Sequence, residues 1–248
     1  TCSACREGRG NCCENIAVIG VHRDGGFSEY LCVPQQNVLL AEGIAPEAVA
    51  LIEPFAISAH AVRRAAVRAG DEVLVVGAGP IGLGAAAIAK AEGARVVVAD
   101  VSDERRAHVM AQLDLPTLDP LAADFDARLR SLFGGNLAQK IVDATGNPQS
   151  MNCAVDLIRH AGSIVFVGLF KGDLQFSDPE FHKKETTLMG SRNATAEDFA
   201  RVGELMRSGE LSAGMLLTHR LRFSELGSTF ERDVINNPRL IKGVIEFA

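Results

Sequence analysis

One glycine-rich turn constrains this chain more than any other feature of its sequence. The apolar, β-branched run Val73–Val76 leads directly into the sequence GAGPIG at residues 77–82, and Ala- and Leu-rich residues follow. In such a turn between a strand and a helix, Gly77 permits a tight bend and Gly79 lets a pyrophosphate approach the backbone. Gly82 then lets the helix pack closely on the strand. The pattern predicts a dinucleotide-binding strand–turn–helix unit.

The residues around this turn suit a bound dinucleotide. Pro80 fits the first helical turn, where its missing N–H costs nothing, and the free N–H groups at a helix start attract phosphate. The second apolar strand ends at Asp100, whose carboxylate can accept hydrogen bonds from ribose hydroxyls and repels a 2′-phosphate. We therefore expect NAD rather than NADP, with Arg105 beside the adenine ribose. The alternative is a glycine-rich turn of another α/β protein, with Asp100 as a helix cap.

Strand-like and helix-like segments alternate from residue 71 onward. The expected strands are near-continuous apolar runs at 73–76, 95–99, 140–143, 163–168 and 186–189. The expected helices lie between them at 80–92, 103–113, 121–132 and 149–159. Residues 115–118 could supply a further strand, although Pro116 disfavours it. The alternation predicts an α/β fold with a doubly wound parallel sheet covered by helices on both faces.

The two ends of the chain have a different character. The first 50 residues carry cysteines, paired glycines and short strand-like pieces such as Glu29–Val33, which indicate irregular β structure. After the sheet we expect helices at about 196–208 and 224–234 and a terminal strand at 243–247. We therefore expect three parts, in which the nucleotide-binding domain separates two pieces of a second domain. Their boundaries are 1–55, 56–189 and 190–248.

Charge and hydropathy exclude several classes of function. The net charge is −6, from 25 basic and 31 acidic residues, which argues against a nucleic-acid partner because that requires a basic face. The longest uncharged run, residues 73–89, is glycine-rich and shorter than the roughly 20 residues of a membrane span. We expect a cytoplasmic protein that acts on a small molecule. The chain begins with Thr1 rather than Met, so its native start is expected to lie upstream.

The first cysteines have the spacing of a metal site. Cys2, Cys5 and Cys13 follow the pattern C-x2-C-x7-C, and thiolates two residues apart can both bind one tetrahedral zinc. Since three ligands do not close a structural site, the fourth is expected upstream of residue 1. Cys12 is either a spare thiol or an alternative ligand. The competing interpretations are unrelated reduced thiols and an iron–sulfur site.

Three further residues have both a functional and a plain structural interpretation. Glu53 stands in the apolar sequence LIEPF, where a carboxylate usually has a partner, so it is either a metal ligand or a helix N-terminal acid before a proline. Thr145 and Gly168 follow the expected fourth and fifth strands, at the edge where open α/β sheets bind ligands. Turn chemistry explains these two nearly as well. His60, in the following helix, is expected to be a packed histidine rather than a ligand.

Together these features resemble the zinc-containing medium-chain dehydrogenase/reductase family over essentially the whole chain. The resemblance includes the cysteine loop, GGFSEY at 25–30, Glu53 with its proline, the glycine fingerprint with Asp100, and Ser191-Arg192. The segments VIGVHRDGGFSEY at 18–30 and SRNA at 191–194 are most similar to the polyol and sugar-acid branch, that of sorbitol, L-idonate and L-galactonate 5-dehydrogenases.

The resemblance implies a role for each matching position. Cys2, Cys5 and Cys13 would hold a structural zinc, and Glu53 would join the catalytic zinc shell. The cofactor contacts are those around the glycine turn and ribose acid, with an arginine near the nicotinamide end: Gly79, Pro80, Ile81, Asp100, Arg105 and Arg192. The fold would be a Rossmann domain inserted in an incomplete, β-rich GroES-like catalytic domain. The family's remaining catalytic ligands, a Cys and a Gly-His-Glu motif, lie upstream of the cysteine loop, so activity is expected only of an intact protein.

The implied reaction is hydride transfer between NAD and a secondary alcohol of a polyol or sugar acid. His22 and Arg23 are candidates for reading a substrate carboxylate, because a guanidinium pairs with it bidentately. A loop salt bridge from Arg23 to Asp24 is the alternative. The competing functions are a non-catalytic NAD-binding or partner-binding module and a zinc-free quinone reductase, which the cysteine loop and Glu53 disfavour. A homodimer or homotetramer is expected.

Overall fold

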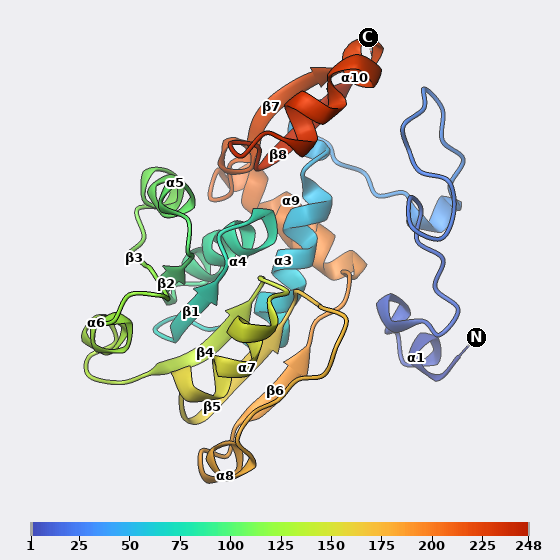
Figure 1. Cartoon of the computed structure of the whole chain (residues 1–248). Coiled ribbons are helices and arrows are strands. Elements are labelled where there is room, and N and C mark those ends of the chain that lie inside the picture. The colour runs from blue at the N-terminus through green and yellow to red at the C-terminus, as the bar shows by residue number, and fades with distance from the viewer. Residues whose placement is uncertain (1, 248) are drawn as a thin grey trace.

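The centre of the protein is one parallel six-stranded sheet. The structure, a computed structural model, describes residues 2–247 (Figure 1). The strands are β1 (Glu72–Val76), β2 (Arg95–Ala99), β3 (Thr117–Leu118), β4 (Ala138–Asp143), β5 (Ile158–Phe166) and β6 (Thr187–Gly190). Their order is β3-β2-β1-β4-β5-β6, and every neighbouring pair is parallel. The expected doubly wound parallel sheet is confirmed, and this strand order is that of dinucleotide-binding folds.

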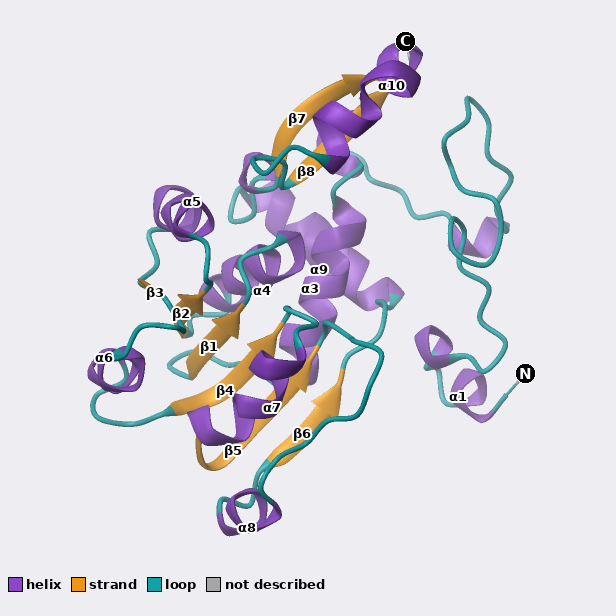
Figure 2. Ribbon diagram, viewed as in Figure 1, coloured by secondary structure: helices purple, strands orange, loops and turns teal. Residues whose placement is uncertain are grey.

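Helices cover both faces of this sheet (Figure 2). One face carries α3 (Ile52–Arg64), α4 (Pro80–Ala91), α5 (Asp103–Leu113) and α9 (Ala196–Ser208), and the other carries α6 (Phe125–Leu132) and α7 (Pro148–Leu157). Successive strand side chains divide between the two cores, with Val73 and Val75 in one and Leu74 and Val76 in the other. Because neighbouring residues of a strand point to opposite faces, both cores require an unbroken apolar run, which explains the strand composition.

Local capping residues set the ends of the best-predicted helices. Helix α5 begins after Ser102, whose Oγ accepts the N–H of Arg105 at 3.3 Å. Helix α9 begins at a capping box between Thr195 and Asp198 and ends at Gly209, where φ is +81°. Both helices have the bounds predicted from the sequence. The helix expected at 121–132 begins later, at residue 125, because the Asp119 carboxylate accepts the N–H of Leu121 and closes a turn first.

The first 50 residues differ from the sequence expectation. Their described part, residues 2–50, contains short helices and loops but no strand, and an isolated bridge joins Ile19 and Arg23. The prediction of a strand at Glu29–Val33 is therefore wrong. Tyr30 is 89% exposed and Leu31 is 49% exposed, so these apolar side chains have no neighbouring sheet to cover them.

The end of the chain forms a small second sheet. Strand β7 (Leu217–Arg222) pairs in parallel with β8 (Lys242–Glu246), close to the predicted terminal strand. Helix α10 (Phe223–Phe230) and a π-helical turn at Glu231–Ile235 connect them. Figure 1 shows this unit at one end of the sheet, on the far side of α3 and α9. No helix in residues 2–247 combines the length and apolar character needed to cross a bilayer.

Candidate functional site

The glycine turn after β1 is sterically closed at two positions. Gly77 has a φ of +92°, and its N–H donates to the carbonyl of Ala99 at 2.7 Å. A Cβ on Gly82 would lie 1.8 Å from the carbonyl oxygen of Gly77. The backbone of the turn therefore rests directly on the first turn of α4, and both positions require glycine.

Gly79, in contrast, faces open space. It is the N-cap residue of α4, with ordinary dihedrals (φ −71°, ψ −179°), and a Cβ there would meet no atom within 4 Å. The first N–H groups of a helix lack partners within it, so α4 offers donors from Ile81 onward beside this space. Pro80, at the first helical position, removes no bond from the helix. Open space beside free helix N–H groups is the arrangement that a cradle for an anionic group requires.

The acid at the end of β2 is bound to this turn. One carboxylate oxygen of Asp100, Oδ2, accepts the N–H of Ala78 at 2.6 Å, and Oδ1 accepts the N–H of Ser102 at 2.8 Å. Because Ser102 is the N-cap of α5, the alternative role of Asp100 as that helix cap is wrong. Asp100 is partly exposed beside the glycine turn.

Arg105 makes a long-range contact that the sequence does not indicate. Its Nη2 donates to the carbonyl of Leu240 at 3.0 Å, and among the described residues its buried Nη1 has no hydrogen-bond partner. Neighbouring Arg106 donates through Nη1 to the carbonyl of Asp100 at 2.5 Å. Sequence reasoning missed Arg106, although an arginine in the first helical turn after an acidic strand end is a signal for such a contact.

The tips of β4 and β5 meet at the same edge of the sheet. The buried Asp143 accepts the N–H and the hydroxyl of Thr145 at 2.8 and 2.6 Å and the hydroxyl of Ser150 at 2.7 Å. A Cβ on Gly168 would lie 2.2 Å from the backbone nitrogen of Gly146. The loops that carry Thr145 and Gly168 are therefore in backbone contact beside the glycine turn. Asp143 fixes the conformation of one of them.

Arg192 follows the end of β6 on an exposed turn. Its backbone carbonyl accepts a hydrogen bond from Nδ2 of Asn11, in the cysteine loop, at 2.9 Å. The next residue, Asn193, has a φ of +50°. The structure thus connects the turn at the end of β6 to the N-terminal loop.

The three cysteines of the predicted metal site lie together. The Sγ atoms of Cys2, Cys5 and Cys13 are all within 4.8 Å of one another, and the Cys2 and Cys5 sulfurs are 3.6 Å apart. Hydrogen bonds from the Glu14 and Cys5 backbones lower the pKa of Cys2 to about 7, whereas the neighbouring thiols raise the pKa of Cys5 to about 11. Three thiolates so close together need a cation to be stable, and thiolate donors suit zinc. This donor set fits the metal that the sequence predicts.

Two other candidate ligands lie outside this cluster. Cys12 turns away, and its sulfur lies 4.0 Å from Nη2 of Arg9. Glu53 is exposed on the first turn of α3, which is the position of a helix N-terminal acid, one of its two interpretations from the sequence. Within residues 2–247 the three cysteines are the one group of at least three side chains with metal-ligand geometry. A catalytic zinc shell is not assembled by the described residues.

The remaining sequence candidates have simple environments. His60 is 5% exposed and hydrogen-bonded on both ring nitrogens, which confirms the expectation of a packed histidine. His22 is exposed, and its Nδ1 accepts the N–H of Val18 at 3.0 Å. Arg23 is exposed on the same loop, where its carbonyl accepts the N–H of Gly20 at 2.9 Å.

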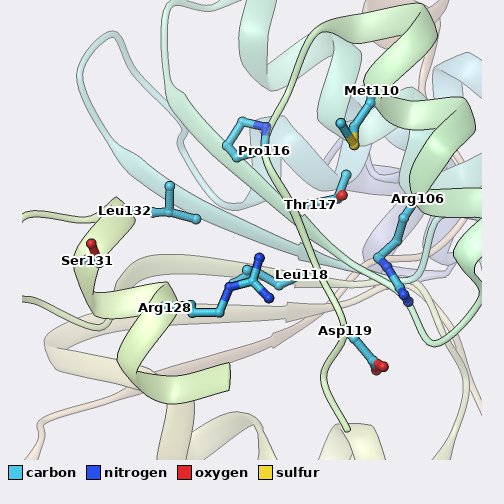
Figure 3. A pocket seen from close by; sticks show the side chains of 9 residues that line it. All are labelled: Arg106, Met110, Pro116, Thr117, Leu118, Asp119, Arg128, Ser131 and Leu132. Carbon is cyan, nitrogen blue, oxygen red and sulfur yellow. The ribbon is translucent and has the colours of Figure 1, made fainter. Parts of the chain in front are cut away.

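A separate hollow of about 540 Å³ lies between α5, β3 and α6. Figure 3 shows Arg128 extending from α6 toward Leu118, with Arg106 on the opposite wall. Its lining includes neither the glycine turn nor Asp100.

Comparison with known proteins gives a consistent set of relatives. The family model for zinc-binding dehydrogenases matches residues 80–208. L-galactonate-5-dehydrogenase of Escherichia coli (strain K12) is 71% identical over 246 residues, which cover 99% of this chain and 72% of that protein. Sorbitol dehydrogenase of Halalkalibacterium halodurans is 30% identical over 228 residues, covering 90% of this chain and 66% of that protein.

Solved structures agree with these matches. An alcohol dehydrogenase from E. coli CFT073, complexed with NADH, superimposes with a TM-score of 0.91 at 29% identity, covering 99% of this chain and 73% of that one. L-Idonate 5-dehydrogenase from E. coli K-12 superimposes with a TM-score of 0.88 at 25% identity, covering 100% of this chain and 72% of that one.

Proposed function

The chain belongs to the zinc-binding dehydrogenase family, and we propose that it transfers a hydride between NAD and a secondary alcohol of a polyol or sugar acid. The observation that carries the proposal is the 71% identity, over 99% of the chain, to an L-galactonate-5-dehydrogenase. Sorbitol and L-idonate dehydrogenases among the other relatives support the same class of substrate.

The crevice at the strand ends supplies the cofactor site. The cradle at Gly79 takes the pyrophosphate, and Asp100 accepts hydrogen bonds from the adenosine ribose. Thr145 and Gly168 line the next part of the crevice, and Arg192 stands toward the nicotinamide end. These residues bind and orient NAD, while the hydride chemistry belongs to the cofactor itself.

Zinc has two distinct places in this proposal. Cys2, Cys5 and Cys13 hold a structural ion that stabilises the N-terminal loop. A catalytic zinc, when bound, acts as a Lewis acid on the substrate hydroxyl. Glu53 is a proposed ligand of that second ion, and one carboxylate does not fix a metal by itself.

The cofactor part of the proposal is tested by fluorescence titration of the chain with NADH and NADPH. We expect tighter binding of NADH, because the Asp100 carboxylate repels the 2′-phosphate of NADPH. Asp100→Asn should weaken NADH binding by at least roughly 10-fold, since it removes charged hydrogen bonds of about 1.5–3 kcal/mol. It should also reduce discrimination against NADPH. Equal affinity of the unaltered chain for both cofactors would contradict the assignment.

The substrate part is tested by NAD reduction with L-galactonate, L-idonate and sorbitol in the presence of zinc. Arg23→Ala tests the further proposal that Arg23 reads the substrate carboxylate. It should weaken the preference for the two acids over sorbitol, and an unchanged preference would exclude Arg23.

A non-catalytic NAD-binding module is the second candidate function. One observation favours it: among the described residues, Glu53 is not grouped with other side chains that could bind a metal ion. NADH binding without turnover of any of these substrates would support this candidate over the first.

The assembly and location of the protein are also proposals. We propose a homodimer or homotetramer, because the outer edge of β6 is unpaired among the described strands and so can accept another strand. We propose a cytoplasmic location because the free thiols of the cysteine loop require a reducing compartment. Light scattering of the purified chain tests the first of these statements.

A further inference from the structure

A buried polar network joins three distant parts of the chain. Asp198 on α9 is 1% exposed, His60 on α3 is 5% exposed, and Asn11 in the cysteine loop is 8% exposed. Nδ1 of His60 lies 2.8 Å from Oδ2 of Asp198, and Nε2 of His60 lies 3.2 Å from Nδ2 of Asn11. Most buried polar groups in proteins are hydrogen-bonded. In Asn11 the amide nitrogen is bonded, whereas the buried Oδ1 has no partner among the described residues.

The charge of Asp198 sets the direction of these hydrogen bonds. Burial raises the pKa of the Asp198 carboxyl, but hydrogen bonds from Arg63, Thr195 and His60 outweigh burial and lower it to about 2. The ionised carboxylate only accepts, and Nδ1 of His60 faces both this carboxylate and Nη2 of Arg63, which lies 3.2 Å away. The backbone carbonyl of Arg192 also only accepts, so the amide end that faces it is the nitrogen of Asn11, which fixes the orientation of the amide.

The same amide nitrogen makes a second hydrogen bond. Nδ2 of Asn11 donates to the backbone carbonyl of Arg192 at 2.9 Å, and Nδ2 of Asn193 donates to the carbonyl of Asn11 at 3.5 Å. Asn193 has a φ of +50°, a conformation that L residues adopt at a cost. The turn after β6 is therefore held in an uncommon backbone conformation by contacts from the cysteine loop.

Asn11 also lies inside the proposed metal loop. It occupies the 3₁₀ turn Gly10–Cys12, between the second and third clustered cysteines and two residues before the third. A cation bound by the three sulfurs closes the loop around Asn11. The position of the amide, and its bond to the turn at Arg192, therefore depends on how well that loop is formed.

We propose that Asn11 is a positioning residue through which zinc binding in the cysteine loop increases the affinity of the crevice for NAD. The proposal rests on the NAD and structural-zinc sites of the proposed function. Zinc orders the cysteine loop, and Asn11 then fixes the backbone carbonyl of Arg192. The turn after β6 thereby keeps the conformation that binds the nicotinamide end of the cofactor. Because such coupling is reciprocal, bound NADH must increase zinc retention by the same factor.

The experiment measures NADH dissociation constants for the full chain, zinc-loaded and after treatment with a chelator. One net hydrogen bond corresponds to a change of about fivefold. We expect zinc to tighten NADH binding by about fivefold in the unaltered chain and to have no such effect in Asn11→Ala. Asn15→Ala is the matched control, because Asn15 is an exposed asparagine just after the same loop. It should keep the full zinc effect.

A second measurement covers the case in which the chelated chain unfolds. Zinc-loaded Asn11→Ala should contain as much zinc as the unaltered chain by metal analysis and yet bind NADH about fivefold more weakly. Asn11→Asp, which keeps the size but removes the donor, should behave in the same way. An Asn11 variant with normal zinc content and unchanged NADH affinity would overturn the proposal, as would a full zinc effect in Asn11→Ala.

The outcome for Asp100 separates this proposal from the proposed function. If NADH binding depends on Asp100 but not on Asn11, the coupling is wrong and the cofactor site stands. If NADH binding is absent, or is unaffected by Asp100→Asn, the proposed function itself is contradicted.

Discussion

Two alanine substitutions in the glycine turn should have opposite consequences. A Cβ at position 82 would lie 1.8 Å from the carbonyl oxygen of Gly77, whereas a Cβ at position 79 would meet no atom within 4 Å. Gly82→Ala therefore damages the folded protein itself. Gly79→Ala leaves the fold intact and fills only the space that the cofactor is proposed to occupy.

The expected magnitudes follow from these contacts. A backbone oxygen cannot rotate away as a side chain does, so Gly82→Ala should cost about 3 kcal/mol, at the upper end for overpacking. For a chain of this size that lowers the melting temperature by roughly 6–12 °C. Gly79→Ala should change the free energy of unfolding by no more than about 1 kcal/mol, since only the cap preference is affected. It should weaken NADH binding by at least about tenfold.

The assays are thermal unfolding followed by circular dichroism and NADH titration by fluorescence. Gly227→Ala on α10 is the control, because a Cβ there also meets nothing within 4 Å and the site is far from the crevice in sequence. It should leave both quantities close to those of the unaltered chain. A normal melting temperature for Gly82→Ala would refute the steric argument, and normal NADH affinity for Gly79→Ala would refute the placement of the pyrophosphate.

Three further predictions concern other parts of the structure. The pKa of Asp198 is lowered from 3.8 to about 2, so its stabilising effect is complete above pH 4 and is lost as the pH falls toward 2. The loss should be roughly 2 kcal/mol, and urea titrations at several pH values should show it in the unaltered chain but not in Asp198→Asn. Cys5→Ser should reduce zinc content by metal analysis, whereas Cys153→Ser, which changes an exposed thiol outside the cluster, should not. Gly168→Ala should lower both stability and NADH affinity, because its Cβ would lie 2.2 Å from a backbone nitrogen of the neighbouring loop; a change in neither would show that these loops separate easily.

Where local chemistry decides a structure, the sequence predicted it closely. The strand Arg95–Ala99 is a β-branched run buried from Val96 onward, and helix Asp103–Leu113 begins at a serine cap, so both bounds follow from neighbouring residues. The contact between Asp100 and the glycine turn also follows from topology, because neighbouring parallel strands bring their carboxyl ends to one edge of the sheet.

Where distant segments decide, the sequence prediction failed or was incomplete. Glu29–Val33 has the composition of a strand, but a strand requires a partner that residues 2–247 do not provide. Arg105 is engaged by the carbonyl of Leu240, which is 135 residues away, and Asn11 is bonded to His60 and Arg192 from still other elements. No local pattern marks Asn11, because its importance comes entirely from what the fold places beside it.

The near-contact between Gly146 and Gly168 limits how this crevice can be redesigned. Two loops that touch through backbone atoms leave no room for a new side chain in either one, and a movement of one displaces the other. A larger side chain introduced at Gly146 or Gly168 to alter cofactor preference would therefore displace these two loops before it could contact the cofactor. Asp100 is a more accessible place to change the nucleotide preference, but a replacement there must still accept the N–H groups of Ala78 and Ser102 to keep the glycine turn and the start of α5 in place.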